Sequence, residues 1–265
     1  MQNRYVGDVG DFGKYGLLRE LHLPGSDASR GLSLGVIWYL VPDEGHNADG
    51  KHTSYLDPTP ANLEYYGCCD PFLYDSLAEI VHRGARHVTS IHNSGILPPA
   101  TVFFEEPLTF DGMPRVGPAA REARLGRRNE WLQRALEATA ECNVVFVDPD
   151  NGLEGSAKRH HKRGAKYVYF DELASYLSRG QSLVVYHHMG RNRPAADQIQ
   201  KRLTQIAKRL ESCDVPLALH YHRGTSRAFF IVPTKAHSAI LFKRAKRLIS
   251  GPWSRHFSLV TPGSP

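Results

Sequence analysis

The sequence predicts an α/β fold in which a doubly wound, mostly parallel sheet carries an antiparallel strand at its edge. Short apolar runs at residues 32–41, 144–147 and 182–186 each stop at polar or turn-forming residues, as strands buried on both faces do. Segments with helical spacing separate these runs, which is the alternation typical of a parallel sheet. Two later runs, at residues 217–221 and 228–233, flank a turn at Arg223-Gly224 and predict a closing strand pair.

Composition is that of a globular protein. The 265 residues are 41% hydrophobic and 23% charged, and they show neither a repeat nor a clear boundary. We therefore expect one domain over residues 1–265, with insertions near 42–70 and 105–120. No apolar run approaches the roughly 20 residues of a membrane span, and the N-terminus lacks the core of a signal peptide, so a cytoplasmic protein is expected.

Charge and cysteine content indicate what the protein binds. Cys68, Cys69, Cys142 and Cys213 have no C-x-x-C spacing, so neither a zinc site nor a disulfide framework is expected. The formal net charge of +6 favours a polyanionic partner.

A glycine-rich segment leads into the first predicted helix. Tyr15, Leu18 and Leu21 have helical spacing, and Asp8 or Asp11 is the candidate cap. Glycines at this place allow the backbone to approach a ligand closely, which favours a binding loop. An N-terminal cap on the sheet is the alternative.

The remaining elements follow in order. Helices are expected at residues 71–83 with Asp70 as the cap, at about 121–140, at 171–178, at 195–211 and at about 236–249. Short strands are expected at 87–91, 101–105 and 167–170.

The strand at 144–147 ends at Asp148-Pro149-Asp150-Asn151-Gly152. Ligands of open α/β sheets bind outside the carboxyl ends of the strands, so this segment is the first candidate site. The same residues also favour a plain turn, which is the alternative. A polar loop at residues 42–50 follows another strand, but it contains no G-x-G-x-x-G motif.

Three segments resemble one family. Gly7-Asp8-Val9-Gly10-Asp11-Phe12-Gly13-Lys14 is similar to the N-terminal G-N-x-x-D-x-x-K signature of the J-type adenine-N6 methyltransferases of large-subunit ribosomal RNA. The segment 147–151 stands where that family carries D-P-P-Y on its fourth strand, and Ile231-Val232-Pro233 resembles its late strand entering a final helix. Asp150 and Asn151 replace the second proline and the aromatic residue, so the ring that stacks on a flipped base is missing from its usual place.

The resemblance implies a Rossmann-like fold of the class I methyltransferase type and transfer of a methyl group from S-adenosylmethionine to an exocyclic amine of a base in RNA or DNA. Asp148 and the Pro149 carbonyl would then accept hydrogen bonds from the amine, with Lys14 and Asp150 as further catalytic candidates. Tyr5 or Tyr186 would replace the missing ring. The expected cofactor contacts are Asp43, Glu44, Gly45 and Asn47.

A basic run at residues 158–166 supplies candidate contacts to backbone phosphates, namely Lys158, Arg159, Lys162, Arg163 and Lys166. A solvated helix face is the alternative for this run.

Two other functions remain open from the residues alone. Asp148, Asp150 and Glu154, with His187 or His188, are suited to bind magnesium or manganese and to hydrolyse a phosphodiester. His187-His188 also fits a packed, hydrogen-bonded pair at the sheet. The third possibility is a nucleic-acid binder without catalytic activity on the same fold.

Overall fold

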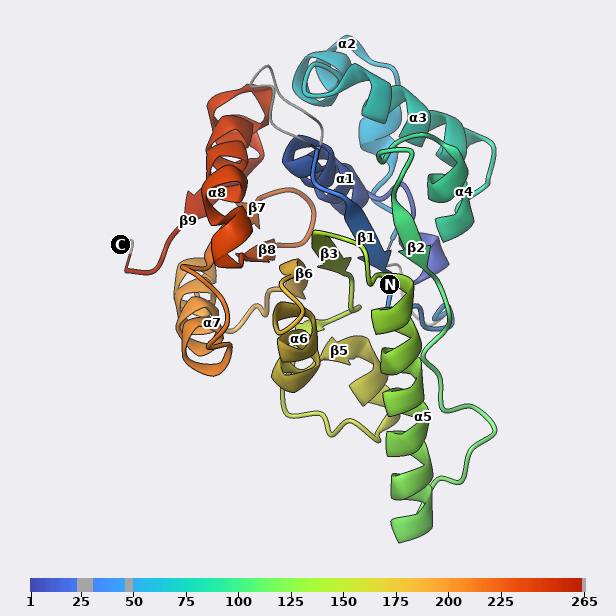
Figure 1. Ribbon diagram of the computed structural model, residues 1–265. Coiled ribbons are helices and arrows are strands. Elements are labelled where there is room, and N and C mark those ends of the chain that lie inside the picture. The colour runs from blue at the N-terminus through green and yellow to red at the C-terminus, as the bar shows by residue number, and fades with distance from the viewer. Residues whose placement is uncertain (23–30, 46–49, 264–265) are drawn as a thin grey trace.

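The computed structural model describes residues 1–22, 31–45 and 50–263 (Figure 1). The strands are β1 (Leu34–Ile37), β2 (Val102–Phe104), β3 (Val144–Val147), β4 (Gly152–Leu153), β5 (Tyr167–Val168), β6 (Ser182–His188), β7 (Leu217–Tyr221), β8 (Arg227–Val232) and β9 (Phe257–Val260). The α-helices are α1 (Val9–His22), α2 (Pro60–Asn62), α3 (Pro71–His82), α4 (Val88–Asn93), α5 (Pro118–Ala138), α6 (Phe170–Leu177), α7 (Ala195–Arg209) and α8 (Lys235–Ser250). Short helical turns are η1 (Asn3–Tyr5), η2 (Ser54–Leu56), η3 (Leu63–Gly67), η4 (Lys162–Lys166) and η5 (Pro252–Arg255).

The central sheet of the described residues has seven strands in the order β2-β1-β3-β6-β8-β7-β9, and β4 and β5 form a separate parallel pair. The strands β2, β1, β3 and β6 are parallel neighbours. Since β8 is antiparallel to both β6 and β7, the strand β7 runs in the same direction as β6. The expected α/β fold with a mostly parallel sheet is therefore confirmed, and it is compatible with a Rossmann-like fold.

The reversed strand β8 lies inside the sheet, where all six of its residues are buried, and the antiparallel strand at the edge is β9. The turn that follows β7 is too short for a crossover, so β8 has to return beside β7. Its apolar residues Phe229, Phe230 and Ile231 suit a position covered on both faces.

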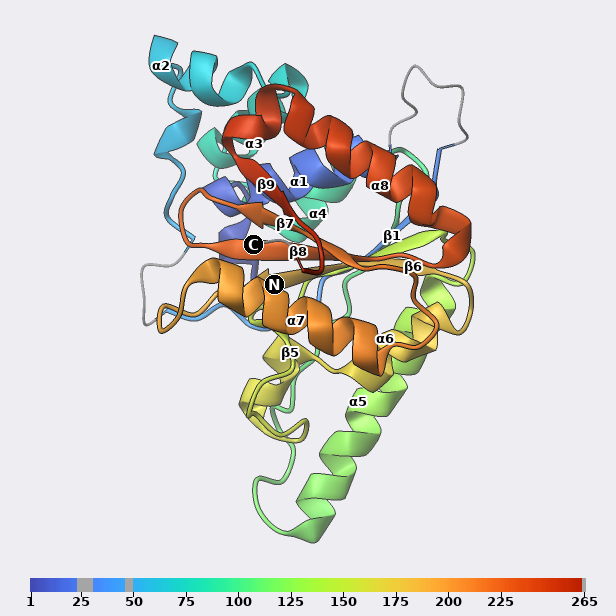
Figure 2. The same cartoon turned by 90° about the vertical axis from the view of Figure 1, so that its left-hand side faces the viewer.

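Helices cover both faces of the sheet. In Figure 2, α1, α3 and α8 lie on one side, and α5, α6 and α7 lie on the other. The side chains of β3 alternate between the two cores, because Val144 and Phe146 join the first and Val145 and Val147 join the second.

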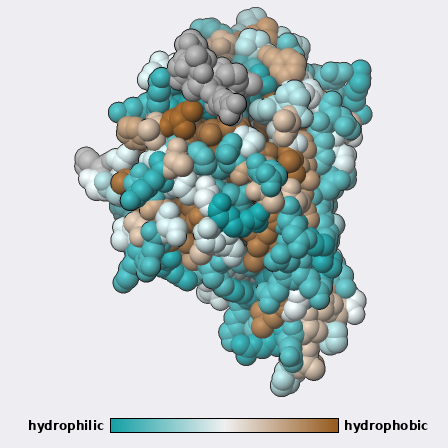
Figure 3. Space-filling view, in the orientation of Figure 1, coloured by the Kyte–Doolittle hydropathy of each residue, from teal (hydrophilic) through white to brown (hydrophobic). Residues whose placement is uncertain are grey.

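The outer face seen in Figure 3 is largely hydrophilic, with hydrophobic residues in small patches. No helix of the described residues is long and apolar enough to cross a membrane.

Two predicted elements are different in the structure. Residues 87–91 were expected as a strand because they include β-branched residues, but they begin α4. The buried residues of this helix are Val88 and Ile91, which have helical spacing, and the His87 ring accepts a hydrogen bond from Thr89 N (3.3 Å) at its start. The strand expected at 167–170 is shorter, because α6 already begins at Phe170. The edge strand β9 was not predicted.

Glycines in α1 allow this helix to pack closely against aromatic side chains of β7 and η5. A Cβ atom at Gly13 would lie 2.4 Å from the ring of Tyr221, and one at Gly16 would lie 2.3 Å from the ring of Trp253. Both rings are buried. The close approach of α1 to these aromatic residues therefore requires glycine.

The substitution Gly13→Ala should lower the free energy of unfolding by about 1 to 3 kcal/mol, because the added methyl group overlaps the buried Tyr221 ring. The matched control is Gly126→Ala in α5, where nothing lies within 4 Å of the added Cβ. That change should stabilise the protein by roughly 0.5 to 1 kcal/mol through helix propensity. Urea unfolding measures both values, and a stabilising Gly13→Ala would contradict the packing described.

Candidate functional site

A cavity of about 410 Å³ lies where β3 and β6 end, beside the start of α1. Asp148 and Pro149 line it from the end of β3, Tyr186 and His188 from β6, and Arg227 from β8. Asp8, Asp11 and Lys14 from the start of α1 complete this part of the wall. The N-terminal signature and the segment after the central strand thus meet at one cavity, as the sequence predicts.

Lys14 joins α1 to the central strand. Its Nζ lies 2.7 Å from Asp11 Oδ1 and 2.7 Å from Asp148 Oδ2, and the residue is only 4% exposed. Asp11 and Lys14 share a face because they are three residues apart in a helix. Burial alone would lower the pKa of the Lys14 ammonium, but Asp11 and Asp148 hold it above its ordinary value. Lys14 is therefore a fixed cation and not a base.

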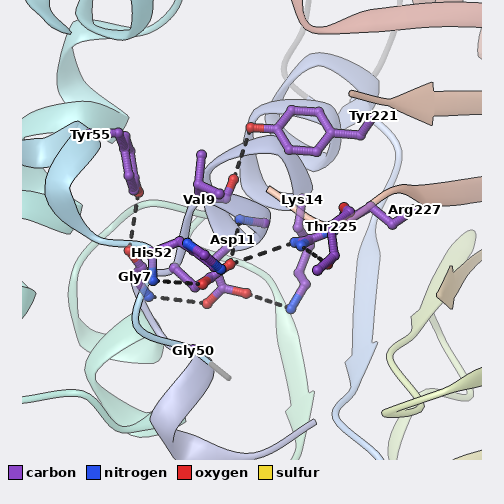
Figure 4. A network of polar contacts seen from close by, with 12 residues as sticks. Gly7, Val9, Asp11, Lys14, Gly50, His52, Tyr55, Tyr221, Thr225 and Arg227 are labelled. Carbon is purple, nitrogen blue, oxygen red and sulfur yellow. Dashed lines mark hydrogen bonds and ion pairs between the residues drawn. The ribbon is translucent and has the colours of Figure 1, made fainter. Parts of the chain in front are cut away.

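Figure 4 shows the polar network around the contact between Asp11 and Lys14. Asp11 Oδ2 accepts hydrogen bonds from Gly7 N (3.3 Å) and from the Tyr15 hydroxyl (3.2 Å). Both oxygens of the Asp11 side chain are thus engaged. The carboxylate is positioned as a partner of Lys14, and it is not available to a ligand.

Asp8 and Arg227 form the neighbouring part of the wall. Asp8 caps α1 by accepting a hydrogen bond from Gly10 N (2.8 Å), as predicted, and it also accepts one from His52 N (3.3 Å). The guanidinium of Arg227 lies 3.7 Å from Asp8 and packs directly against α1. A Cβ at Gly10 would lie 1.0 Å from Arg227 Nη1, so any side chain there would have to displace the guanidinium.

Two acceptors at the end of β3 remain open. Asp148 Oδ2 is bound to Lys14, whereas Asp148 Oδ1 has no hydrogen-bond or ion-pair partner among the residues that the structure describes. The Pro149 carbonyl likewise accepts no hydrogen bond from the described part of the chain. Both residues line the cavity, and Asp148 is 2% exposed. The arrangement presents a carboxylate oxygen and a carbonyl oxygen from adjacent residues.

Aromatic rings line the same cavity. Both Tyr5 and Tyr186 reach it. The Lys14 ammonium lies 6.0 Å from the centre of the Tyr186 ring, and burial raises the pKa of the Tyr186 hydroxyl to about 12. Arg4 covers the Tyr5 ring at 5.3 Å. The Tyr186 ring therefore lies beside the Lys14 ion pair.

Asp150 connects two loops. Its Oδ2 accepts a hydrogen bond from Gln2 Nε2 (2.9 Å) and lies 3.0 Å from Lys166 Nζ. Burial alone would raise the pKa of Asp150, but the positive groups of Met1 and Lys166 and the Gln2 hydrogen bond lower it below its ordinary value. Lys166 also lies 2.6 Å from Glu44, so it ties the loop after β1 to the loop after β3.

Three of the four residues expected to hold the cofactor lie in the described part of the chain, and their surroundings differ. Glu44 lines the cavity, whereas Asp43 is exposed and accepts a hydrogen bond from Arg4 N (3.3 Å). Gly45 is exposed, and Asn47 lies outside the described residues. Among the described residues, Glu44 is thus the expected cofactor contact that reaches the cavity.

The N-terminal residue Met1 is anchored to the segments that follow β1 and β3. Its amino nitrogen donates to the carbonyls of Tyr39 (3.2 Å) and Asp148 (3.0 Å), and its carbonyl accepts from Val41 N (3.0 Å). The segment thus lies between the ends of β1 and β3. Tyr39 has a φ of 44°. It is the one non-glycine residue with a positive φ in the described part of the chain.

The five basic residues predicted to hold phosphates fall into two groups. Lys158, Lys162 and Arg163 are exposed. Arg159 pairs with Asp171 and covers the Tyr169 ring at 4.5 Å, and Lys166 points inward to Asp150 and Glu44. The run is therefore neither a single solvated helix face nor a single row of free cations.

The alternative metal ligands lie apart. Glu154 Oε2 accepts a hydrogen bond from Phe170 N (3.1 Å), and its other oxygen pairs with Arg209. Across residues 1–22, 31–45 and 50–263, no group of three or more His, Cys, Asp or Glu side chains is arranged to hold a metal ion. The absence of such a cluster in the described residues and the two bound oxygens of Glu154 both argue against a metal site here.

The two adjacent histidines have different surroundings. His187 is buried, and its Nδ1 accepts a hydrogen bond from Leu153 N (3.1 Å), as the packed alternative predicts. His188 lines the cavity and does not share this packing.

Asp11 and Arg227 belong to the site but were not predicted for it. Asp11 was considered only as a cap, although its position in the signature, three residues before Lys14, was an available signal. Arg227 comes from the reversed strand, and no local motif marks it.

Comparison of the sequence with protein-family models and with curated proteins gave no significant match, and neither did comparison with solved structures.

His187 predicts a pH dependence of stability. Burial lowers its pKa from 6.5 to about 3, so between these pH values the ring is neutral in the fold and takes up a proton on unfolding. Its contribution is complete above pH 6.5 and is lost as the pH falls toward 3, by up to about 1.4 kcal/mol per pH unit. In His187→Asn, whose amide oxygen can replace Nδ1 as acceptor, unfolding measured between pH 7 and pH 4.5 should fall less steeply than in the wild type. Equal slopes in the two proteins would show that His187 is not held neutral.

Proposed function

We propose that this protein transfers a methyl group to an exocyclic amine of a base in a nucleic acid, with Asp148 and Pro149 as the residues that bind the amine. The observation that supports this most directly is the pair of open acceptors, Asp148 Oδ1 and the Pro149 carbonyl, on one cavity. An exocyclic amine has two N–H groups, and two adjacent acceptors match them.

The acceptor pair also suits the chemistry of the amine. The nitrogen is a weak nucleophile because its lone pair is delocalised into the ring. Hydrogen bonds from both N–H groups to fixed acceptors favour a geometry in which the lone pair points toward a methyl donor. Proline contributes because its ring fixes φ and thereby aims the carbonyl.

In this proposal each residue has a limited task. Lys14 holds the Asp148 carboxylate through Oδ2 and leaves Oδ1 for the ligand. When the nitrogen gains a methyl group it must lose one proton, and Asp148 Oδ1 accepts it. Tyr186 provides an aromatic face for the base. S-adenosylmethionine is the methyl donor that the sequence resemblance implies, and Glu44 is the expected cofactor contact that lines the cavity.

Metal-dependent hydrolysis is less well supported. Asp150 is bound to Gln2 and Lys166, and Glu154 is bound to Arg209 and to the backbone of Phe170. Asp150 Oδ1 lies 4.0 Å from the Met1 amino group, so Asp148 alone of the three expected ligands keeps an oxygen without a partner among the described residues.

The substitution Asp148→Asn should lower the rate of methyl transfer from radiolabelled S-adenosylmethionine to single-stranded oligonucleotides by about 100-fold or more, because the proton acceptor is lost. The matched control is Asp75→Asn on the exposed face of α3, which should leave the rate unchanged. A variant Asp148→Asn with the wild-type rate would remove Asp148 from the mechanism. A wild-type protein that binds the oligonucleotide but transfers no methyl group would support the non-catalytic binder.

A further inference from the structure

A second concave surface lies between α5 and the basic segment. This groove has a volume of about 740 Å³, and the first half of α5 forms one wall while His160 and His161 belong to the other. Arg115, Arg121 and Arg124 line it. Glu122 is the one carboxylate among the lining residues.

The arginines of α5 divide into two sets. Arg127 and Arg134 pair with Glu106, and Arg128 pairs with Glu172. Arg121 and Arg124 have no ion pair with a carboxylate of the described residues. The second set is the one that faces the groove, so its charge is not compensated from within the protein.

Exposed cations flank the two histidines of the opposite wall in the sequence, although they do not themselves line the groove. Lys158, Lys162 and Arg163 belong to the same short segment as His160 and His161, and none of the three forms an ion pair with the described residues. We call the set of Arg115, Arg121, Arg124, Lys158, Lys162 and Arg163 the basic groove. Partial desolvation and the positive charges of its neighbours, among them Arg121 and Lys158, lower the pKa of His160. The groove is therefore a concentrated region of positive charge.

The two walls are held together from inside. The buried Arg128 of α5 donates hydrogen bonds to the carbonyls of Gly164 (2.9 Å) and Tyr167 (2.7 Å) while it pairs with Glu172. Arg124 Nη1 donates to the His160 carbonyl (3.2 Å). A ligand at the groove would meet walls that are already positioned, which lowers the entropic cost of binding.

The groove and the cavity both lie toward the carboxyl ends of the central strands. A short connection joins the end of α5 to β3, so α5 runs opposite to β3 and its first half lies toward the carboxyl ends of the strands (Figure 1). Figures 1 and 2 show this half of α5 extending beyond the sheet. The segment 150–166 links the two sites, because Lys166 pairs with Asp150 at the cavity and the other end of η4 reaches the groove.

We propose that the basic groove binds the phosphodiester backbone of a single-stranded nucleic acid whose target base occupies the Asp148 cavity. The placement of a target base in the Asp148 cavity rests on the proposed function. The binding of the phosphodiester backbone at the basic groove does not. A single strand fits because one base has to enter the cavity alone, which a stacked and paired base cannot do without being flipped out. A concave, basic surface complements a chain of phosphates better than it complements a flat membrane.

The test measures binding and its salt dependence by fluorescence anisotropy, with a fluorescein-labelled oligouridylate of about 15 nucleotides as the probe. The groove variant carries Lys158→Ala, Lys162→Ala and Arg163→Ala. Because each phosphate contact on a single strand contributes about 0.7 to the slope of log affinity against log salt, losing three contacts should make the slope shallower by about 2.

The matched control carries Lys235→Ala, Lys243→Ala and Lys246→Ala, which remove the same charge from exposed positions of α8 on the other face of the sheet. Its slope should equal that of the wild type. Equal losses in both triple variants would overturn the proposal, because binding would then follow net charge alone. Binding to phosphatidylserine vesicles without binding to the oligonucleotide would also overturn it.

The variant Asp148→Asn separates the two proposals. It should keep the wild-type salt slope, because Asp148 is not part of the groove. If the groove variant loses the slope while the wild-type protein shows no methyl transfer, the proposed function fails and the groove assignment stands. If Asp148→Asn loses methyl transfer while the groove variant binds like the wild type, the groove assignment fails.

Discussion

The ion pairs of Lys14 with Asp11 and Asp148 connect the first helix to the central strand, and the candidate site depends on them. All three side chains are almost fully buried, so removing one charge would leave the others without a partner in a poorly solvated place. The same contact fixes the Asp148 carboxylate with one oxygen bound and one oxygen open. Because Lys14 stays protonated, it holds this arrangement and does not compete for protons. Stability and chemistry at this cavity therefore share one interaction.

Most of the fold followed from hydrophobic periodicity, because strands such as Val144–Val147 and helices such as Pro71–His82 carry strong local patterns. The errors arose where tertiary contacts decide. Residues 87–91 contain β-branched side chains, but only Val88 and Ile91 find buried positions, at a helical interval. The strand β9 is held by its pairing with β7. Only Phe257 of β9 is buried, so this edge strand has no clear alternation of apolar and polar residues.

The site was predictable in part. Lys14, Asp148 and Pro149 stood in recognisable segments, and the sheet brings those segments together because helix α1 starts at the edge where β3 ends. Arg227 was not predictable, since it reaches the cavity only because β8 returns inside the sheet. The anchoring of the N-terminal residue was not predictable either. The backbone of Met1 lies between the ends of β1 and β3, and no local pattern in the sequence indicates that the chain folds back there.

A double-mutant cycle between Lys14→Met and Asp148→Asn tests the central ion pair most directly, with the free energy of unfolding in urea as the measured quantity. We expect Lys14→Met alone to lower that free energy by about 3 to 5 kcal/mol, because two buried carboxylates lose their counter-ion. The double variant should lose less than the sum of the single losses, by at least about 1 kcal/mol, since Asp148→Asn removes one of those charges. Additive losses within about 0.5 kcal/mol would show that Lys14 and Asp148 do not stabilise each other, and they would contradict this account of the site.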